Sequence, residues 1–247
     1  METHAHHLHK TPGRGWKHYL FEFLMLFLAV TLGFFVENKR EDYADEKRGR
    51  QYINSFVQDL EKDTSAFSNL ISVYETKSSV LKNLFPCYDS VTGILHSSDC
   101  LLDMTGHTLG FPDLVYTDRT LQQLKNAGGL RLLKQDDADS ITAYDNWLRT
   151  VEKNETTEMQ ETQTLLRGIA YELFNFNSIK QRVTGKNDIG NSKAPFIYGN
   201  NVELLNRYFN VLGSYGNAVH DQISNISDLR ERAISVIKYF HNKYHLK

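Results

Sequence analysis

Residues 16–42 read WKHYLFEFLMLFLAVTLGFFVENKRED, and this stretch decides how the chain is organised. The 14 residues from Phe23 to Val36 carry no charge, and eleven of them are Leu, Phe, Val or Met, which leaves no polar face. Counted from Trp16, a helix ending at Val36 is about 30 Å long, close to the thickness of the hydrocarbon core of a bilayer. We therefore predict a single transmembrane helix over 16–36. The alternative is a buried helical hairpin.

Several side chains of this segment have the character of membrane or interface residues. Trp16 and Tyr19 fall where aromatic residues favour the boundary between lipid and water. Glu22 lies about one turn inside the apolar stretch, and an ionisable residue within a span marks a functional site by default. The alternative is that Glu22 lies at headgroup depth and reaches water beside Lys17 or His18. The candidate membrane or interface residues are Trp16, Tyr19, Glu22 and Gly33.

The segment is expected to be an uncleaved signal anchor. No small-x-small cleavage site and no lipobox cysteine follow the apolar run. Three Lys or Arg residues precede the span and five follow it up to Arg50, so the positive-inside rule does not favour a cytoplasmic N-terminus. We still expect the N-terminus inside, because a single N-terminal anchor with a short tail usually exports the domain that follows.

The remainder of the chain is predicted to be helical. Proline interrupts helices, and the 247 residues contain only four prolines. Apolar residues recur at three- and four-residue steps from Ile53 to Leu84, with Asp63 or Thr64 and Lys77 filling gaps in this apolar seam. Asp59, on the same helix, is expected on its polar surface. The membrane helix is therefore expected to continue into the first soluble helix and to end before Pro86.

Further helices follow from the same reasoning. A short helix from Asp118 to about Ala127 is predicted to stop at Gly128 and Gly129, and a final pair of helices is predicted to be interrupted at Gly213 and Gly216. The fold class is all-α, with the transmembrane helix continuing into an elongated antiparallel helical bundle. The predicted organisation has three parts: a polar His-rich tail (1–15), the transmembrane helix (16–36) and a soluble helical domain (37–247). Within the soluble domain, long helices are predicted over about 40–85, 136–176 and 218–244. Loops are predicted over 86–116 and 177–200.

The sequence carries no pattern of a known catalytic or metal site. Its 28 basic and 30 acidic residues give a net charge of −2, which argues against nucleic-acid binding. None of the ten histidines follows a Glu by three residues, which excludes the Glu-x-x-His pairs of di-iron bundles. HExxH, GxSxG and the Walker pattern are absent. We expect no catalytic residue, no cofactor and no metal site, and only weak, unselective metal binding by the His-rich tail.

The two cysteines, Cys87 and Cys100, bracket the first half of the 86–116 loop. They are too few for a disulfide scaffold and lack the CxxC spacing of a metal site. One hypothesis is a bridge between them, which requires an oxidising compartment. The alternative is two buried or free thiols.

Two stretches resemble a known family. The run HLHKTPGRGWKHYLFEFLMLFLAVTLGFFVENKRE and the following RQYINSFVQDLEKDT are similar to uncharacterised bacterial membrane-anchored proteins of the domain-of-unknown-function 6090 type. The later RTLQQLKNAGGLRLLKQDDADSITAYD is similar to the family's second signature. The resemblance implies a Gram-negative inner-membrane protein with a periplasmic helical domain, and it implies no activity. The matching positions of the first signature are Glu22, Asn38, Tyr52, Asp59 and Leu60.

Three functions are therefore considered. The first is a non-enzymatic scaffold or sensor that is anchored in the lipid bilayer and acts as a homo-oligomer or by docking a membrane or periplasmic protein. The second is an accessory subunit of a channel or transporter, with Glu22 in an oligomeric transmembrane interface. The third is an enzyme that uses the 86–116 and 177–200 loops as a pocket.

Overall fold

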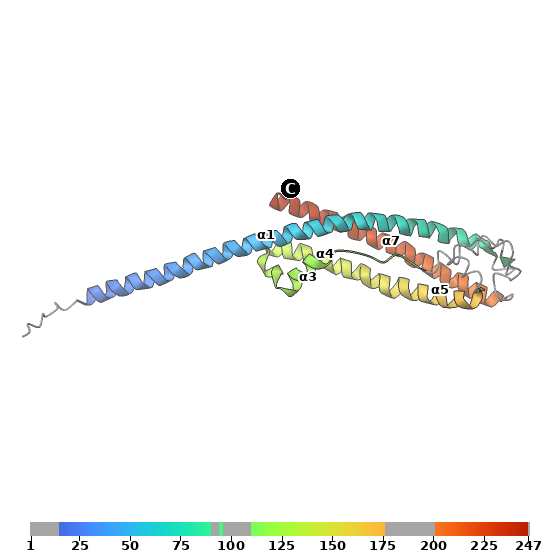
Figure 1. Cartoon of the computed structure of the whole chain (residues 1–247), viewed down its shortest axis with the longest axis horizontal. Coiled ribbons are helices and arrows are strands. Elements are labelled where there is room, and N and C mark those ends of the chain that lie inside the picture. Colours follow the sequence, from blue (N-terminus) through green and yellow to red (C-terminus); the bar gives the residue numbers. More distant parts are fainter. Residues whose placement is uncertain (1–14, 90–93, 96–109, 176–200, 247) are drawn as a thin grey trace, which may run out of the picture. The chain divides into compact units, whose positions relative to one another are not determined.

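The computed structural model describes residues 15–89, 94–95, 110–175 and 201–246, and these are almost entirely helical (Figure 1). The exception is a short antiparallel pair of strands, β1 (Tyr88–Asp89) and β2 (Ile94–Leu95). The predicted all-α class is confirmed. The chain divides into two compact units, 1–49 and 50–247, where the sequence predicted a boundary after residue 36.

The first unit contains the beginning of helix α1 (Trp16–Leu84). Its apolar side chains are exposed along the whole stretch from Trp16 to Val36, including Leu26 at 67% and Phe34 at 68%. Among the described residues, α1 is the helix that is long and apolar enough to cross a membrane. The prediction of a membrane anchor is therefore consistent with this helix.

Beyond the apolar stretch, α1 is charged on its surface. Arg40 pairs with Glu37 at 2.5 Å and Arg48 pairs with Asp45 at 3.4 Å, each one turn apart along the helix. Exposed pairs of this kind contribute little to stability. They support the helix locally and form no site.

The second unit is built around three long helical stretches that lie side by side (Figure 1). The first is α1 from Arg50 onward. The core joins all three: the Phe56 ring lies edge-on to Tyr144, at 6.0 Å between centroids, and to Phe240, at 6.4 Å. Burial of apolar side chains such as these rings supplies the main driving force for folding. The other stretches are α4 (Gln135–Asn154), which continues through the π-helical turn η3 (Glu155–Met159) into α5 (Gln160–Leu173), and α7 (Val202–Tyr244).

Contacts between distant residues give the direction of each helix. Phe56 contacts Phe240, and further along α1 Ser68 accepts a hydrogen bond from Arg230 at 2.7 Å, so α1 and α7 are antiparallel. The first turn of α4 likewise contacts the last turn of α7. It follows that α1 and α4 run parallel to each other, and the chain between them must return along their length. This connectivity differs from the antiparallel bundle that the sequence predicted, because α1 and α4 are parallel.

Two short elements precede α4. Helix α3 (Arg119–Asn126) begins after Asp118, and the 3-10 turn η2 (Gly129–Leu132) follows it. Gly128 has φ of +68°, a left-handed conformation in which a side chain is strained. The glycine stop predicted at this point is present.

The predicted interruption of the last helix is wrong, because α7 continues through Gly213 and Gly216. A Cβ at either glycine would come within 4.0 Å of the Phe85 ring, which is ordinary contact. Each glycine costs a helix about 1 kcal/mol relative to alanine, and burial of the flanking Leu212 and Tyr215 outweighs that cost. The helix predicted over 136–176 also differs, since it contains a π turn and ends at Leu173.

Candidate functional site

Residues 110–118 form an extended segment, here called the strap, that lies along α1 and the α4–η3 stretch (Figure 1). It returns along α1 in the opposite direction, because its early residues contact the end of α1 and its late residues contact Asp63. The strap provides the return path that the parallel α1 and α4 require. It lies at the end of the loop predicted over 86–116.

The helices hold the strap by its backbone. The Tyr74 hydroxyl donates to the carbonyl oxygen of Pro112 at 2.8 Å, and the Leu114 N–H donates to Oε1 of Glu155 at 2.9 Å. The second bond satisfies a backbone group that would otherwise be buried without a partner. Lys77 donates to the carbonyl oxygen of Gly110.

Asp63 holds the other end of the strap. Its carboxylate accepts the Thr117 N–H at 2.9 Å and the Thr117 hydroxyl, also at 2.9 Å. One turn earlier, Asp59 accepts a hydrogen bond from Thr120. Asp59 is only 2% exposed, so its predicted place on the polar surface is wrong: its carboxylate contacts Arg119 and Thr120 of α3. Burial raises the pKa of Asp63, while the hydrogen bonds from Thr117 oppose that rise.

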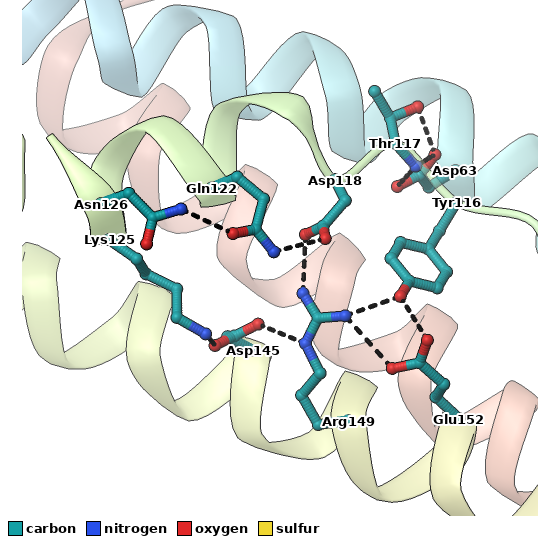
Figure 2. A network of polar contacts seen from close by, with 10 residues as sticks. All are labelled: Asp63, Tyr116, Thr117, Asp118, Gln122, Lys125, Asn126, Asp145, Arg149 and Glu152. Carbon is teal, nitrogen blue, oxygen red and sulfur yellow. Dashed lines mark hydrogen bonds and ion pairs between the residues drawn. The ribbon is translucent and has the colours of Figure 1, made fainter.

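Arg149 on α4 ties the strap and α3 to this helix (Figure 2). Its guanidinium contacts Asp145 through Nε at 3.2 Å and Asp118 through Nη2 at 2.7 Å. Nη1 donates to the Tyr116 hydroxyl at 2.6 Å and to Glu152 at 3.2 Å. The planar fork of an arginine suits such a cluster, because it donates in several fixed directions at once. The neighbouring polar side chains in the figure are Lys125, which binds Asp145 at 2.6 Å, and Gln122, which binds Asp118 at 2.8 Å.

Two charged groups beneath the strap are buried. Burial raises the pKa of Glu155, and burial lowers the pKa of Lys77 to about 8. Within the described part of the chain, no carboxylate lies within ion-pair distance of Lys77, whose Nζ is 5.2 Å from the centre of the Tyr215 ring. The cation is therefore held by a carbonyl oxygen and an aromatic face.

A second polar cluster closes the end of the helices. Asp137 is fully buried and accepts hydrogen bonds from Tyr244 at 2.5 Å, Lys243 at 2.6 Å and Tyr239 at 2.9 Å. Burial alone would raise the pKa of Asp137, but these hydrogen bonds outweigh it and hold the pKa below its ordinary value. This cluster joins the first turn of α4 to the end of α7.

The surface of the second unit is hollowed beside Phe85. Two pockets of about 420 and 500 Å³ flank this ring, and Gly213 and Asn217 line both of them. In the segments that the structure describes, His, Cys, Asp and Glu form no group of three or more that could hold a metal ion. The polar groups of the strap and of the Asp137 cluster are used to fasten one segment to another.

The predicted membrane residues belong to the first unit. Trp16, Tyr19, Glu22 and Gly33 all lie in the apolar part of α1, and all four are exposed. A Cβ placed at Gly33 would meet no atom within 4 Å other than the helix's own nearby backbone. These residues lie in the segment that the sequence predicts to span a membrane.

Two other predictions fall on residues that the structure does not describe. Cys87 is buried, at 5% exposure, but Cys100 lies outside the described residues, so the bridge between them stays a prediction. The His-rich tail and the 177–200 loop also lie outside the described residues.

No known protein family, curated protein or solved structure matches this chain. The resemblance to the membrane-anchored family therefore stays an expectation drawn from the sequence stretches quoted above.

Proposed function

We propose that this protein is a single-pass membrane-anchored scaffold or sensor whose helical unit docks a partner protein or a second copy. The observation that carries the proposal is the exposure of every apolar side chain from Trp16 to Val36 on one helix. Soluble proteins rarely expose a continuous apolar surface of this length. A helix satisfies its own backbone hydrogen bonds, so this segment is suited to lipid.

The proposed location is the bacterial inner membrane, with the helical unit in the periplasm. The resemblance described above supports this orientation. Single cysteines at exposed positions such as Val73 test it in intact cells, with a thiol reagent that crosses only the outer membrane. Labelling without breakage of the inner membrane is expected. Labelling only after breakage would contradict the periplasmic orientation.

The scaffold proposal is supported by how the polar side chains of the second unit are used. Arg149 has four hydrogen-bonded partners, and Asp137 has three. Such clusters fasten segments together and give a shape that a partner can recognise. Purification in mild detergent, followed by mass measurement, tests self-association and docking. A strict monomer that binds no other protein would contradict the proposal.

A second candidate is an accessory subunit of a channel or transporter. Glu22 favours it, because an acid within an apolar helix is costly in lipid unless it meets a polar group or water. In an oligomer, several Glu22 side chains would share an interface or line a conduit. Reconstituted currents that fall when Glu22→Gln is introduced would support this candidate. Currents unaffected by that change would contradict a role for the acid.

A further inference from the structure

Two neighbouring pockets lie between the end of α1 and α7, and the Phe85 ring borders both of them. The Ser78 pocket, of about 420 Å³, extends back along α1 as far as Ser78, and the Tyr88 pocket, of about 500 Å³, extends to Tyr88 of β1. Both volumes lie within the range of about 300–1,000 Å³ that is usual for small-molecule sites. Neither the strap nor the Asp137 cluster contributes a described side chain to these pockets.

Two glycines of α7 keep the space beside Phe85 open. Gly213 lines both pockets, and Gly216 lines the Ser78 pocket. A Cβ at either position would lie 4.0 Å from the Phe85 ring, so a side chain longer than that of alanine would fill the space beside the ring. Glycine is unfavourable in a helix interior, and one of its uses is close approach of a ligand to the backbone.

Several polar side chains that line the pockets are free to bind a ligand. Within the described part of the chain, no hydrogen bond uses the side-chain amides of Asn206, Asn210 and Asn217. Ser78 is only 8% exposed, and its hydroxyl also has no hydrogen-bond partner among these residues. Buried polar groups are normally hydrogen-bonded. The position of Ser78 in the pocket wall therefore indicates that a group in the pocket supplies the missing bond.

The Tyr88 pocket has the chemistry of a sugar site. Its described side chains are all uncharged, and its asparagines follow one another along one face of α7. An amide both donates and accepts hydrogen bonds, which matches the hydroxyl groups of a sugar. Phe85 is 39% exposed, and an aromatic face attracts the C–H groups that one side of a sugar ring presents.

The Ser78 pocket adds a positive charge to this site. Lys82 lines it from α1 and His220 from α7. Lys82 forms no ion pair within the described residues, so its ammonium is available to an anion. No described carboxylate lines either pocket, so a negatively charged ligand is not repelled. The two pockets together suit a ligand with one neutral polyhydroxyl part and one anionic part.

We propose that the two pockets bind an acidic glycan, in which a neutral sugar in the Tyr88 pocket is joined to a carboxylate-bearing sugar in the Ser78 pocket. Phe85 and Asn217 line both pockets and contact both sugars. Lys82 pairs with the carboxylate, and the Ser78 hydroxyl bonds the same sugar. This site goes beyond the proposed function and requires neither membrane anchoring nor the docking of a partner.

A tetrasaccharide of alternating N-acetylglucosamine and glucuronate offers both parts and serves as the probe. It is titrated into the full-length chain in lipid nanodiscs, and saturation-transfer NMR measures binding against empty nanodiscs. We expect about tenfold weaker binding of a neutral N-acetylglucosamine tetrasaccharide, which lacks the carboxylates. No binding of either probe, or equal affinity for both, would overturn the proposal. Displacement of the acidic probe by an equal concentration of inorganic phosphate would also overturn it, because the site would then select small anions only.

Two substitutions locate the binding in the pockets. Gly213→Met fills the space beside Phe85 and is expected to abolish binding of both probes, whereas Ser224→Met, at an exposed position of α7 outside both pockets, is expected to have no effect. Lys82→Met is expected to lower affinity for the acidic probe about tenfold and to leave affinity for the neutral probe unchanged. Lys62→Met, at an exposed position of α1 outside both pockets, is its control.

Circular dichroism establishes that each variant is folded. Ser78→Ala removes only a hydroxyl and is expected to weaken binding several-fold, so this variant decides the matter if Gly213→Met does not fold. Unchanged binding by Ser78→Ala and Lys82→Met would overturn the proposal. A chain that binds neither probe but still associates with itself or with a partner would leave the proposed function standing without this site.

Discussion

Asp137 and Lys243 are 106 residues apart in the chain, yet Nζ of Lys243 lies 2.6 Å from Oδ1 of Asp137. The carboxylate is completely buried, while the lysine side chain keeps 25% of its surface exposed. A buried charge of this kind is tolerated only where hydrogen bonds replace water. The contact therefore fixes the end of α7 to the start of α4.

We expect Asp137→Asn to destabilise the helical unit by about 2 kcal/mol, because the neutral amide removes the charged acceptor of Lys243 and turns an NH2 group toward one of the three donors. Thermal or urea unfolding, followed by circular dichroism, measures this loss. Asp136→Asn is the matched control, since Asp136 is an exposed neighbour on the same turn. Equal stability of the two variants would contradict a structural role for the buried carboxylate.

The same site has a defined pH dependence. The pKa of Asp137 lies below its ordinary value in the folded chain, so its contribution to stability is complete above the unfolded pKa of about 3.9. That contribution is lost as the pH falls through the folded pKa. Below pH 4, the free energy of unfolding is therefore expected to fall less steeply in Asp137→Asn than in the unchanged chain. Parallel curves would contradict this account of Asp137.

The contribution of Glu155 to stability is expected to depend on pH in the opposite direction. Burial raises its pKa, so the unfolded chain ionises first, and stability is lost as the pH rises from about 4.3 to the folded pKa. Glu155→Gln removes this loss and keeps an oxygen that can accept the Leu114 N–H. The variant is expected to gain stability relative to the unchanged chain between pH 4 and pH 7. A constant difference across that range would show that Glu155 does not titrate as proposed.

Arg149→Lys tests the clamp between α4 and the strap. Lysine cannot reproduce the fork that joins Asp118, Asp145 and Tyr116, so a loss of about 1–2 kcal/mol is expected. Arg48→Lys, which alters an exposed ion pair in the first unit, is the control and is expected to change stability by less than about 0.5 kcal/mol. A loss no larger than that of the control would mean that the Arg149 cluster adds nothing measurable to the free energy of unfolding.

Two glycines are expected to respond in opposite directions. Gly216→Ala should stabilise α7 by about 0.5–1 kcal/mol, because its Cβ would meet Phe85 at an ordinary distance of 4.0 Å. Gly128→Ala should destabilise by about 1 kcal/mol, since φ there is +68°. Unfolding curves of both variants measure the difference. Stabilisation by Gly128→Ala would contradict its left-handed role.

The helical class of this chain could be predicted from its sequence because the signals are periodic or local. The apolar seam from Ile53 to Leu84 needs only the helical repeat, and the turn at Gly128 needs only glycine's access to positive φ. The interruption predicted at Gly213 and Gly216 was wrong because the local glycine signal is overridden by burial of the flanking Leu212 and Tyr215.

The strap could not be predicted in the same way. Residues 110–118 have no repeat, and their position depends on side chains far away in the sequence, such as Glu155. One signal was present: Asp63 and Lys77 interrupt the apolar seam of α1, and both are buried against the strap. A polar residue at a core position indicates a buried partner, but it does not identify that partner.

Membrane anchoring by residues 16–36 is the central claim, and alkaline extraction of membranes tests it most directly. The full-length chain, with its N-terminus uncleaved as shown by intact mass, is expected to stay in the membrane pellet. Leu28→Arg, at the middle of the apolar stretch, should weaken that retention, whereas Val73→Arg, exposed in the second unit, should not. Recovery of the unchanged full-length chain in the soluble fraction would contradict the account.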